Sequence, residues 1–243
     1  MLLTTMQMKA VAPGQAALAP DAGAGRKRIT VLGATGSVGR NTLDVIGRNP
    51  GLFEVGALTA NRNAQALAEL ALLHQAKLAV LADDSRYSEL KDRLAGTGIE
   101  VAAGSAALID AASMSADCVM AGIIGAAGLR PTLAAVAQGR RVGLANKECL
   151  VCAGGIFMDA VASAGADLVP VDSEHSAVFQ VLYGADPEAL ERIVLTGSGG
   201  PFRTWTLEQL EHVTPEQSLR HPNWSTGRQL TIDPATLMNK GQE

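Results

Sequence analysis

The sequence predicts the α/β fold class, with a doubly wound parallel sheet followed by a second domain. From Arg28 on, short β-branched or apolar runs alternate with longer segments of helical periodicity, and glycines stand at the junctions. Beyond about Val151 this alternation loosens, and polar motifs follow one another closely. We therefore expect a tail at residues 1–25, a sheet domain at residues 26–150 and a second domain at residues 151–243.

The tail is rich in Ala, Gly and Pro, and Pro13, Gly14 and Pro20 interrupt its apolar stretches. This composition is typical of a disordered segment. It lacks the basic start and unbroken apolar stretch of a secretory signal, and the Arg and Ser of an organelle transit peptide. No later segment has the roughly 18 uninterrupted apolar residues of a membrane-spanning helix. We therefore expect a cytoplasmic protein that does not associate with a membrane.

Six strands are expected in the sheet domain, each a short β-branched or apolar run. They are Ile29–Leu32, Phe53–Leu58, Leu78–Leu81, Ile99–Ala102, Asp117–Met120 and Arg141–Leu144. Between them, apolar residues recur at helical spacing in segments such as Val38–Arg48, Asn63–His74 and Leu129–Gln138. Parallel strands require crossover connections of this kind.

Composition limits the class of partner. The chain has 243 residues, of which 47% are hydrophobic and 18% charged, so it can bury a substantial core. Its net charge of -4, with no long Lys or Arg run, argues against a nucleic-acid partner. Small anionic ligands are the expected partners.

The three cysteines are Cys118, Cys149 and Cys152, and their odd number argues against a disulfide framework. The spacing of Cys149 and Cys152 matches half of a redox or zinc site. However, no second Cys/His pair accompanies them and the surrounding stretch is apolar and helix-like. We therefore favour buried packing.

The clearest ligand-binding motif is the glycine turn Gly33-Ala-Thr-Gly36-Ser-Val-Gly39, which follows a predicted strand and opens a predicted helix. Such a turn allows backbone N–H groups to approach a pyrophosphate at the positive end of the helix. Its spacing differs from the usual G-x-G-x-x-G. The alternative is a tight strand-to-helix turn with no ligand.

Arg62 suggests which dinucleotide would bind. A site specific for NAD usually ends its second strand with an acid that holds the ribose 2′-hydroxyl, whereas here that strand runs into Thr59-Ala-Asn-Arg62-Asn63. A guanidinium suits a 2′-phosphate instead, so NADPH is the inferred cofactor. The alternative is that Arg62 is a solvated surface cation.

A second group of polar residues begins at Val171-Asp172-Ser173-Glu174-His175. In an extended segment Asp172 and Glu174 would project to the same side. Two carboxylates arranged in this way suit Mg²⁺ or Mn²⁺ better than a soft metal. A capping role at the start of a helix is the alternative.

Three further segments carry polar residues. Thr196-Gly-Ser198-Gly-Gly200 follows the strand-like Ile193–Leu195 and suits a phosphate-binding loop, or else a flexible turn. A titratable imidazole, a rigid proline and an indole are combined in His221-Pro-Asn-Trp224. The segment Asn239-Lys240-Gly-Gln-Glu243 offers an amide, a cation and a carboxylate, although an ordinary polar chain end would look similar.

Together these residues resemble the 1-deoxy-D-xylulose 5-phosphate reductoisomerase family. The resemblance covers everything after the tail. It rests on five motifs in order: Gly33–Gly39, Leu144-Ala-Asn146-Lys147-Glu148, Pro170–His175, Leu195–Arg203, and His221–Ser225 through Asn239 to Glu243. It implies a Rossmann-like domain followed by an α+β catalytic domain. The implied reaction is the NADPH- and metal-dependent rearrangement and reduction of 1-deoxy-D-xylulose 5-phosphate to 2-C-methyl-D-erythritol 4-phosphate, in the non-mevalonate route to isoprenoids.

The resemblance also implies roles for individual residues. The ligands of Mg²⁺ or Mn²⁺ would be Asp172, Glu174 and Glu243. The cofactor-binding residues would be Thr35, Gly36, Ser37, Val38, Arg62, Asn63, Asn146 and Glu148. The phosphorylated sugar substrate would be held by Ser173, Lys147, Ser198, His221, Trp224, Asn239 and Lys240. The catalytic residues would be Glu174, His221 and Lys240.

Two features depart from the family pattern. Pro234 stands where the family has a serine whose hydroxyl binds the substrate phosphate, and proline cannot form that bond. Family members also continue well past the residue that matches Glu243, so we expect an incomplete catalytic domain in a truncated chain. Three possibilities stay open: an active homodimeric reductoisomerase, an inactive NADPH-binding remnant or interaction protein, and an NADPH dehydrogenase of another family.

Overall fold

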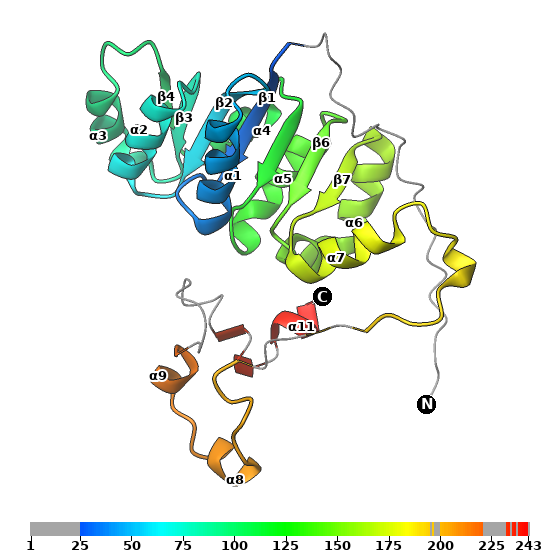
Figure 1. Cartoon of the computed structure of the whole chain (residues 1–243). Helices are drawn as coiled ribbons and strands as arrows, with labels where there is room; N and C mark the ends of the chain where they lie inside the picture. Colours follow the sequence, from blue (N-terminus) through cyan, green and yellow to red (C-terminus); the bar gives the residue numbers. More distant parts are fainter. Residues whose placement is uncertain are drawn as a thin grey trace.

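The computed structural model describes residues 25–194, 196, 200–220, 232–233, 235–236 and 238–242, and for residues 187, 239 and 240 the backbone only. Its centre is a seven-stranded sheet in the order β4-β3-β2-β1-β5-β6-β7 (Figure 1). Every neighbouring pair of strands is parallel. The predicted doubly wound α/β sheet is therefore confirmed.

All six predicted strands form, with their ends shifted by no more than two residues. A seventh strand, β7, was not predicted, because its segment Asp167-Leu-Val-Pro170 has only two strongly apolar residues inside it. The strands are β1 Lys27–Leu32, β2 Phe53–Ala60, β3 Leu78–Leu81, β4 Glu100–Ala103, β5 Cys118–Ala121, β6 Arg141–Leu144 and β7 Asp167–Pro170.

Helices cover both faces of the sheet (Figure 1). One face carries α1 Ser37–Arg48, α2 Ala64–Leu73 and α3 Tyr87–Arg93, whose apolar residues share a core cluster. The other carries α4 Ser105–Ser113, α5 Leu129–Val136 and α6 Glu148–Ala164. Short 3₁₀ turns precede α3 and α5, namely η1 Asp84–Arg86 and η2 Ala126–Gly128.

Side chains of the strands pack alternately into the apolar cores on the two faces of the sheet. In β1, Ile29 and Val31 pack into the cluster beneath α1 and α2, whereas Leu32 packs into the cluster beneath α5 and α6. Successive residues of a strand point to opposite faces, so a strand covered on both sides must be apolar throughout. This explains why the predicted strands are continuous apolar runs rather than alternating ones.

The direction of strand addition reverses between β1 and β5. From β1 the chain adds strands β2, β3 and β4 on one side, and strands β5, β6 and β7 on the other. At such a reversal the two loops that follow the strands diverge to opposite faces and leave a crevice at the carboxyl ends. The loops after β1 and β5 meet at this point, where Gly33 lies against Gly122.

Two expectations concern the later part of the chain. The sheet continues past residue 150, because β7 is hydrogen-bonded to β6 along its length, while the division into domains at that residue stays a prediction. The prediction of a strand-like segment at Ile193–Leu195 was wrong for its described residues, since Ile193 and Val194 are not in a strand. Both side chains are exposed, and no strand of the described residues pairs with them.

The remaining described elements are short. They are α7 Ser173–Leu182, η3 Pro187–Ala189, α8 Leu207–Leu210, α9 Pro215–Ser218 and α11 Met238–Gln242. Helices α8 and α9 each begin with a capping box, built by Thr206 with Gln209 and by Thr214 with Gln217. In the described part of the chain, no helix has both the length and the apolar character needed to span a bilayer.

Candidate functional site at the carboxyl edge of the sheet

The predicted site residues that the structure describes gather at one edge of the sheet. Because all seven strands are parallel, the segments that follow them lie at the same edge. Thr35 and Gly36 follow β1, Arg62 and Asn63 follow β2, and Asn146 to Glu148 follow β6. Asp172 to Glu174 follow β7, so four separate motifs share this edge.

The glycine turn between β1 and α1 is closely packed. Gly33 has a φ of 83°, and a Cβ atom there would lie 2.7 Å from the Gly122 carbonyl oxygen. A Cβ atom on Gly39 would lie 2.6 Å from the Ala34 Cα, so the helix approaches the turn more closely than any side chain allows. These glycines therefore bring the start of α1 against the end of β1.

The start of α1 leaves donors available. Gly36 is the N-cap residue and has no side chain to accept from the first-turn N–H groups, and the first turn contains no acidic residue. The N–H groups of Ser37 and Val38 belong to this turn, where the partial positive charge of the helix is concentrated. This end of α1 is thus chemically suited to an anion.

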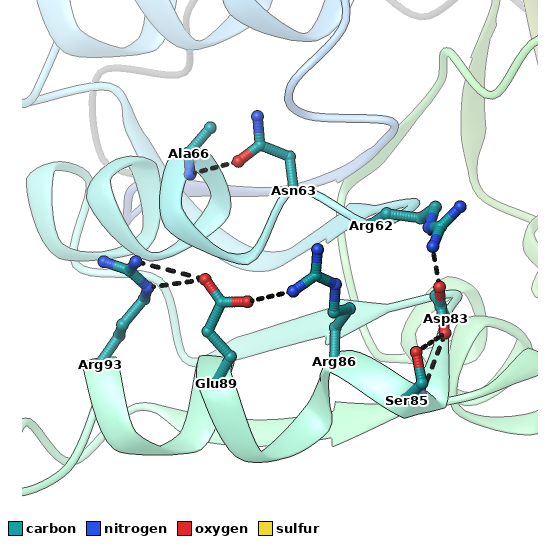
Figure 2. Close-up of polar contacts among 8 residues, drawn as sticks. All are labelled: Arg62, Asn63, Ala66, Asp83, Ser85, Arg86, Glu89 and Arg93. Atoms are coloured by element: carbon teal, nitrogen blue, oxygen red, sulfur yellow. Dashed lines mark hydrogen bonds and ion pairs between the residues drawn. The ribbon is translucent and has the colours of Figure 1, made fainter.

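The turn after β2 positions two of the predicted residues (Figure 2). Arg62 Nε lies 2.9 Å from the Asp83 Oδ2 atom. Asn63 is the N-cap of α2, where its side-chain oxygen accepts a hydrogen bond of 2.9 Å from the Ala66 N–H. Hydrogen bonds from Ser85 lower the pKa of Asp83, and the positive charge of Arg62 adds to this effect. Asp83 was not predicted, although it follows a predicted strand at the same edge.

Asn146 is almost completely buried, with 2% of its surface exposed. Its side-chain N–H group donates to the carbonyl oxygens of Ile123 and Gly125, which lie in the loop after β5. The amide therefore ties the loops after β5 and β6 together. Among the described residues its Oδ1 atom has no hydrogen-bond partner, and a buried acceptor of this kind is costly unless something donates to it.

Lys147 and Asp172 form a half-buried ion pair in which Lys147 Nζ lies 3.0 Å from Asp172 Oδ2. The other carboxylate oxygen, Asp172 Oδ1, is buried and accepts no hydrogen bond from the described residues. The Nδ1 atom of His175 lies 3.8 Å from it.

The expected extended geometry of Asp172 and Glu174 was wrong. Asp172 is the N-cap of α7, and Glu174 lies in the first turn of that helix. The alternative capping role does not describe Asp172 either, because its side chain makes no cap hydrogen bond. The carboxylate pairs with Lys147 through Oδ2, while its Oδ1 atom lies 3.8 Å from the Nδ1 atom of His175 in the same helix. The Ser173 hydroxyl instead donates a hydrogen bond of 2.5 Å to Glu174 Oε2.

A further carboxyl group, Asp233, lies near this cluster and was not predicted. It is 9% exposed. Burial raises its pKa, and the negative charge of Glu148 adds to that rise while Lys147 opposes it. The only sequence signal was its position beside Pro234.

The cysteine pair does not form a common site. Cys149 is 1% exposed, and burial raises its thiol pKa to about 11, so the packing role predicted for it is confirmed. Cys152 is exposed on the same helix, so packing does not describe it. In the part of the chain that the structure describes, no three His, Cys, Asp or Glu residues are grouped closely enough to hold a metal.

The remaining predicted residues belong to the later motifs. Five of them lie outside the described residues: Ser198, His221, Trp224, Glu243 and Pro234, which differs from the family pattern. Asn239 and Lys240 belong to α11, whose backbone is described there without their side chains.

Comparison with protein families identifies related sequences. Residues 29–154 match the profile described as 1-deoxy-D-xylulose 5-phosphate reductoisomerase, and residues 168–243 match its C-terminal domain profile. Reductoisomerases from Nitrobacter hamburgensis and Rhizobium meliloti are 54% and 56% identical to this chain over 220 residues. Each alignment covers 90% of this chain and 54% or 56% of the relative, so the chain spans about half the length of the curated relatives it matches.

Solved structures agree with this similarity. The reductoisomerase from Zymomonas mobilis in complex with NADPH superposes with a TM-score of 0.83 at 52% identity, covering 89% of this chain and 56% of that one. A reductoisomerase in complex with NADPH, fosmidomycin and magnesium superposes with a TM-score of 0.81 at 36% identity, covering 89% and 56%. The likeness extends from the sheet into the motifs that follow it.

Proposed function

Because this chain belongs to the 1-deoxy-D-xylulose 5-phosphate reductoisomerase family, we propose that it binds NADPH and Mg²⁺ or Mn²⁺. With these it would convert 1-deoxy-D-xylulose 5-phosphate to 2-C-methyl-D-erythritol 4-phosphate by rearrangement and reduction. The chain covers 54% of the length of one such relative. A cytoplasmic location and a homodimer stay predictions.

The cofactor would lie across the reversal of strand order. Its pyrophosphate would receive the first-turn N–H groups of α1 from Gly36 to Val38, with Thr35 beside them. Arg62 would contact the 2′-phosphate through the guanidinium nitrogens that Asp83 leaves free, and Asn63 would stand beside it. When bound, NADPH supplies the hydride for the reduction.

The buried side chain of Asn146 provides the best support for a nucleotide at this edge of the sheet. Its Oδ1 atom is buried and has no partner among the described residues, although its N–H group is fully used by the loop after β5. An acceptor held in this way fits a donor from the ribose or nicotinamide end of the cofactor. Glu148, the first residue of α6, would line the same end.

Asp172 fits the proposed metal site by the same test. Its Oδ1 atom is buried without a hydrogen-bond partner in the described part of the chain, and a carboxylate oxygen is a ligand that Mg²⁺ and Mn²⁺ prefer. Glu174, two residues further on, and Glu243 would complete the set. A divalent ion held here supplies Lewis-acid polarisation of a substrate carbonyl.

The substrate would lie between the ion pair and the later motifs. Lys147 provides a cation 3.0 Å from Asp172, and Ser173 provides a hydroxyl at the start of α7. Ser198, Asn239 and Lys240 would hold the phosphate, while His221 and Trp224 would cover the substrate and exclude water. Glu174, His221 and Lys240 keep their proposed catalytic roles.

The function is tested by NADPH oxidation. The purified chain is mixed with NADPH and 1-deoxy-D-xylulose 5-phosphate, with and without Mn²⁺, and absorbance at the nicotinamide band is followed. We expect Mn²⁺-dependent oxidation, and its loss in Glu174→Gln. The matched control is Glu188→Gln, an exposed acid in η3, which should retain the activity.

A parallel titration with NADPH, monitored by protein fluorescence, measures cofactor binding separately from oxidation. Binding without oxidation would contradict the proposed reaction while leaving the cofactor site intact. Failure to bind NADPH at all would contradict the cofactor assignment as well. Turnover that persists in Glu174→Gln would exclude that residue from the metal site.

A further inference from the structure

The loop after β3 contributes a residue to the edge of the proposed cofactor site. Asp83 lies two residues after the end of β3, and its backbone N–H donates to the Asn61 carbonyl oxygen at 3.0 Å. The preceding N–H, that of Ala82, donates to the Ala60 carbonyl oxygen at 2.9 Å. These two hydrogen bonds join the segment after β3 to the end of β2 and hold Asp83 beside the turn that carries Arg62.

Both carboxylate oxygens of Asp83 are engaged (Figure 2). Oδ1 accepts hydrogen bonds from the Ser85 N–H at 3.0 Å and from the Ser85 hydroxyl at 2.6 Å. Oδ2 lies 2.9 Å from Arg62 Nε. The carboxylate is thus fixed by its own loop before it meets the guanidinium, and 22% of its side chain is exposed.

The contact uses only one nitrogen of Arg62. Because Asp83 contacts Nε, the two terminal nitrogens of the planar guanidinium fork are left to bind a phosphate through two hydrogen bonds. The Arg62 side chain is 68% exposed, so this fork faces open solvent. The neighbouring Arg86 is held by Glu89 at 3.0 Å instead, so Asp83 is paired with Arg62.

We propose that Asp83 is a positioning residue for cofactor choice, which holds the Arg62 fork ready for the 2′-phosphate and so favours NADPH over NADH. This inference rests on the proposed NADPH site. A long side chain that is already ordered loses less conformational entropy on binding. NADH has no 2′-phosphate, so its affinity does not depend on the direction of Arg62.

Charge repulsion alone predicts the opposite change in NADPH affinity when Asp83 loses its charge, so the two explanations can be distinguished. A carboxylate near a phosphate repels it, so removing the negative charge of Asp83 should strengthen NADPH binding if charge alone mattered. In Asp83→Asn, the amide oxygen can keep the Ser85 hydrogen bonds, but the amide N–H group then faces Arg62 Nε. The ion pair is lost while the turn is retained.

The experiment titrates the full chain with NADPH and with NADH, following protein fluorescence. For Asp83→Asn we expect the Kd for NADPH to rise about two- to tenfold, the range set by ordering one long side chain on binding, with the Kd for NADH unchanged. The matched control is Asp84→Asn, which removes the same charge one residue away. Asp84 is exposed, and the described residues make no hydrogen bond or ion pair with its side chain. This control should bind NADPH as well as the original chain or slightly better.

A double-mutant cycle assigns the effect to Arg62. In an Arg62→Ala background, Asp83→Asn should no longer alter the Kd for NADPH. An unchanged or lower Kd for NADPH in the single variant Asp83→Asn would overturn the inference, as would equal losses for NADPH and NADH. NADH binding also reports that the variant is folded. If the original chain binds neither nucleotide, the proposed function fails, which is a different result.

Discussion

Lys147 Nζ lies 3.0 Å from Asp172 Oδ2, joining residues that are 25 positions apart in the sequence. Lys147 follows β6 and Asp172 follows β7, and these strands are neighbours in the sheet. The side chains of Lys147 and Asp172 are 9% and 18% exposed, so solvent screens their charges only partly. This ion pair connects the cofactor edge of the sheet to the proposed metal site.

Replacing Lys147 by Met should destabilise the fold. It should also show whether the Lys147 ammonium competes with a metal ion for the Asp172 carboxylate. The variant leaves a half-buried carboxylate without this partner, so we expect the free energy of unfolding in urea to fall by about 1–3 kcal/mol. If a metal binds Asp172, Mn²⁺ should raise the Tm of Lys147→Met more than that of the original chain, because the competing cation is gone. Asp172→Asn is the control, in which Mn²⁺ should have little effect.

Gly39→Ala should disrupt the glycine turn. Its Cβ would lie 2.6 Å from the Ala34 Cα, which is backbone and cannot move aside cheaply. We expect a loss of about 1–3 kcal/mol in urea unfolding, together with weaker NADPH binding. Gly155→Ala in α6 is the matched control, because a Cβ there has no heavy atom within 4 Å. This control should be neutral or more stable, since alanine is the better helix former. Equal effects of the two changes would contradict the packing argument.

Glu54 should make stability depend on pH. A hydrogen bond from Arg28 holds the pKa of Glu54 below its ordinary value, and the charges of Lys77, Arg28 and Arg26 add to the effect, with burial opposing it. A carboxyl whose pKa is lower in the folded state stabilises the fold above the unfolded-state pKa, and this stabilisation is lost as the pH falls through the folded-state pKa. Glu54→Gln should therefore be less stable than the original chain at pH 7, and the difference should shrink below about pH 4. Thermal unfolding across that range measures it, and a difference that persists in acid would exclude the ionic explanation.

The two cysteines of α6 should differ in reactivity. Burial raises the pKa of Cys149 to about 11, which keeps the thiol protonated at pH 8, whereas Cys152 is exposed. Iodoacetamide should label Cys152 in the native chain and Cys149 only after unfolding. Peptide mass spectrometry distinguishes the sites, and equal labelling of both in the native chain would show that α6 opens readily.

The sequence by itself determined six of the seven strands and the turn that begins the site. Six strands could be predicted because strands buried on both faces are continuous apolar runs, a local property of the chain. The glycines at 33, 36 and 39 predicted a close strand-to-helix turn, because the absence of side chains at a fixed spacing is also a local property of the chain. The motifs were also sufficient to indicate the family, because each is a short segment of fixed spacing.

Only the tertiary structure decided which residues meet. Asp83 reaches Arg62, and Lys147 reaches Asp172, because β2 lies beside β3 and β6 lies beside β7. Strand order depends on how crossovers pack across the whole sheet, which local periodicity does not record. β7 was missed for a local reason, since its short segment contains few apolar residues. Asp172 was expected in an extended segment because the residue pattern alone did not show that a helix begins there. Its position at the start of α7 follows from the end of β7 at the sheet edge, where the chain turns into a helix.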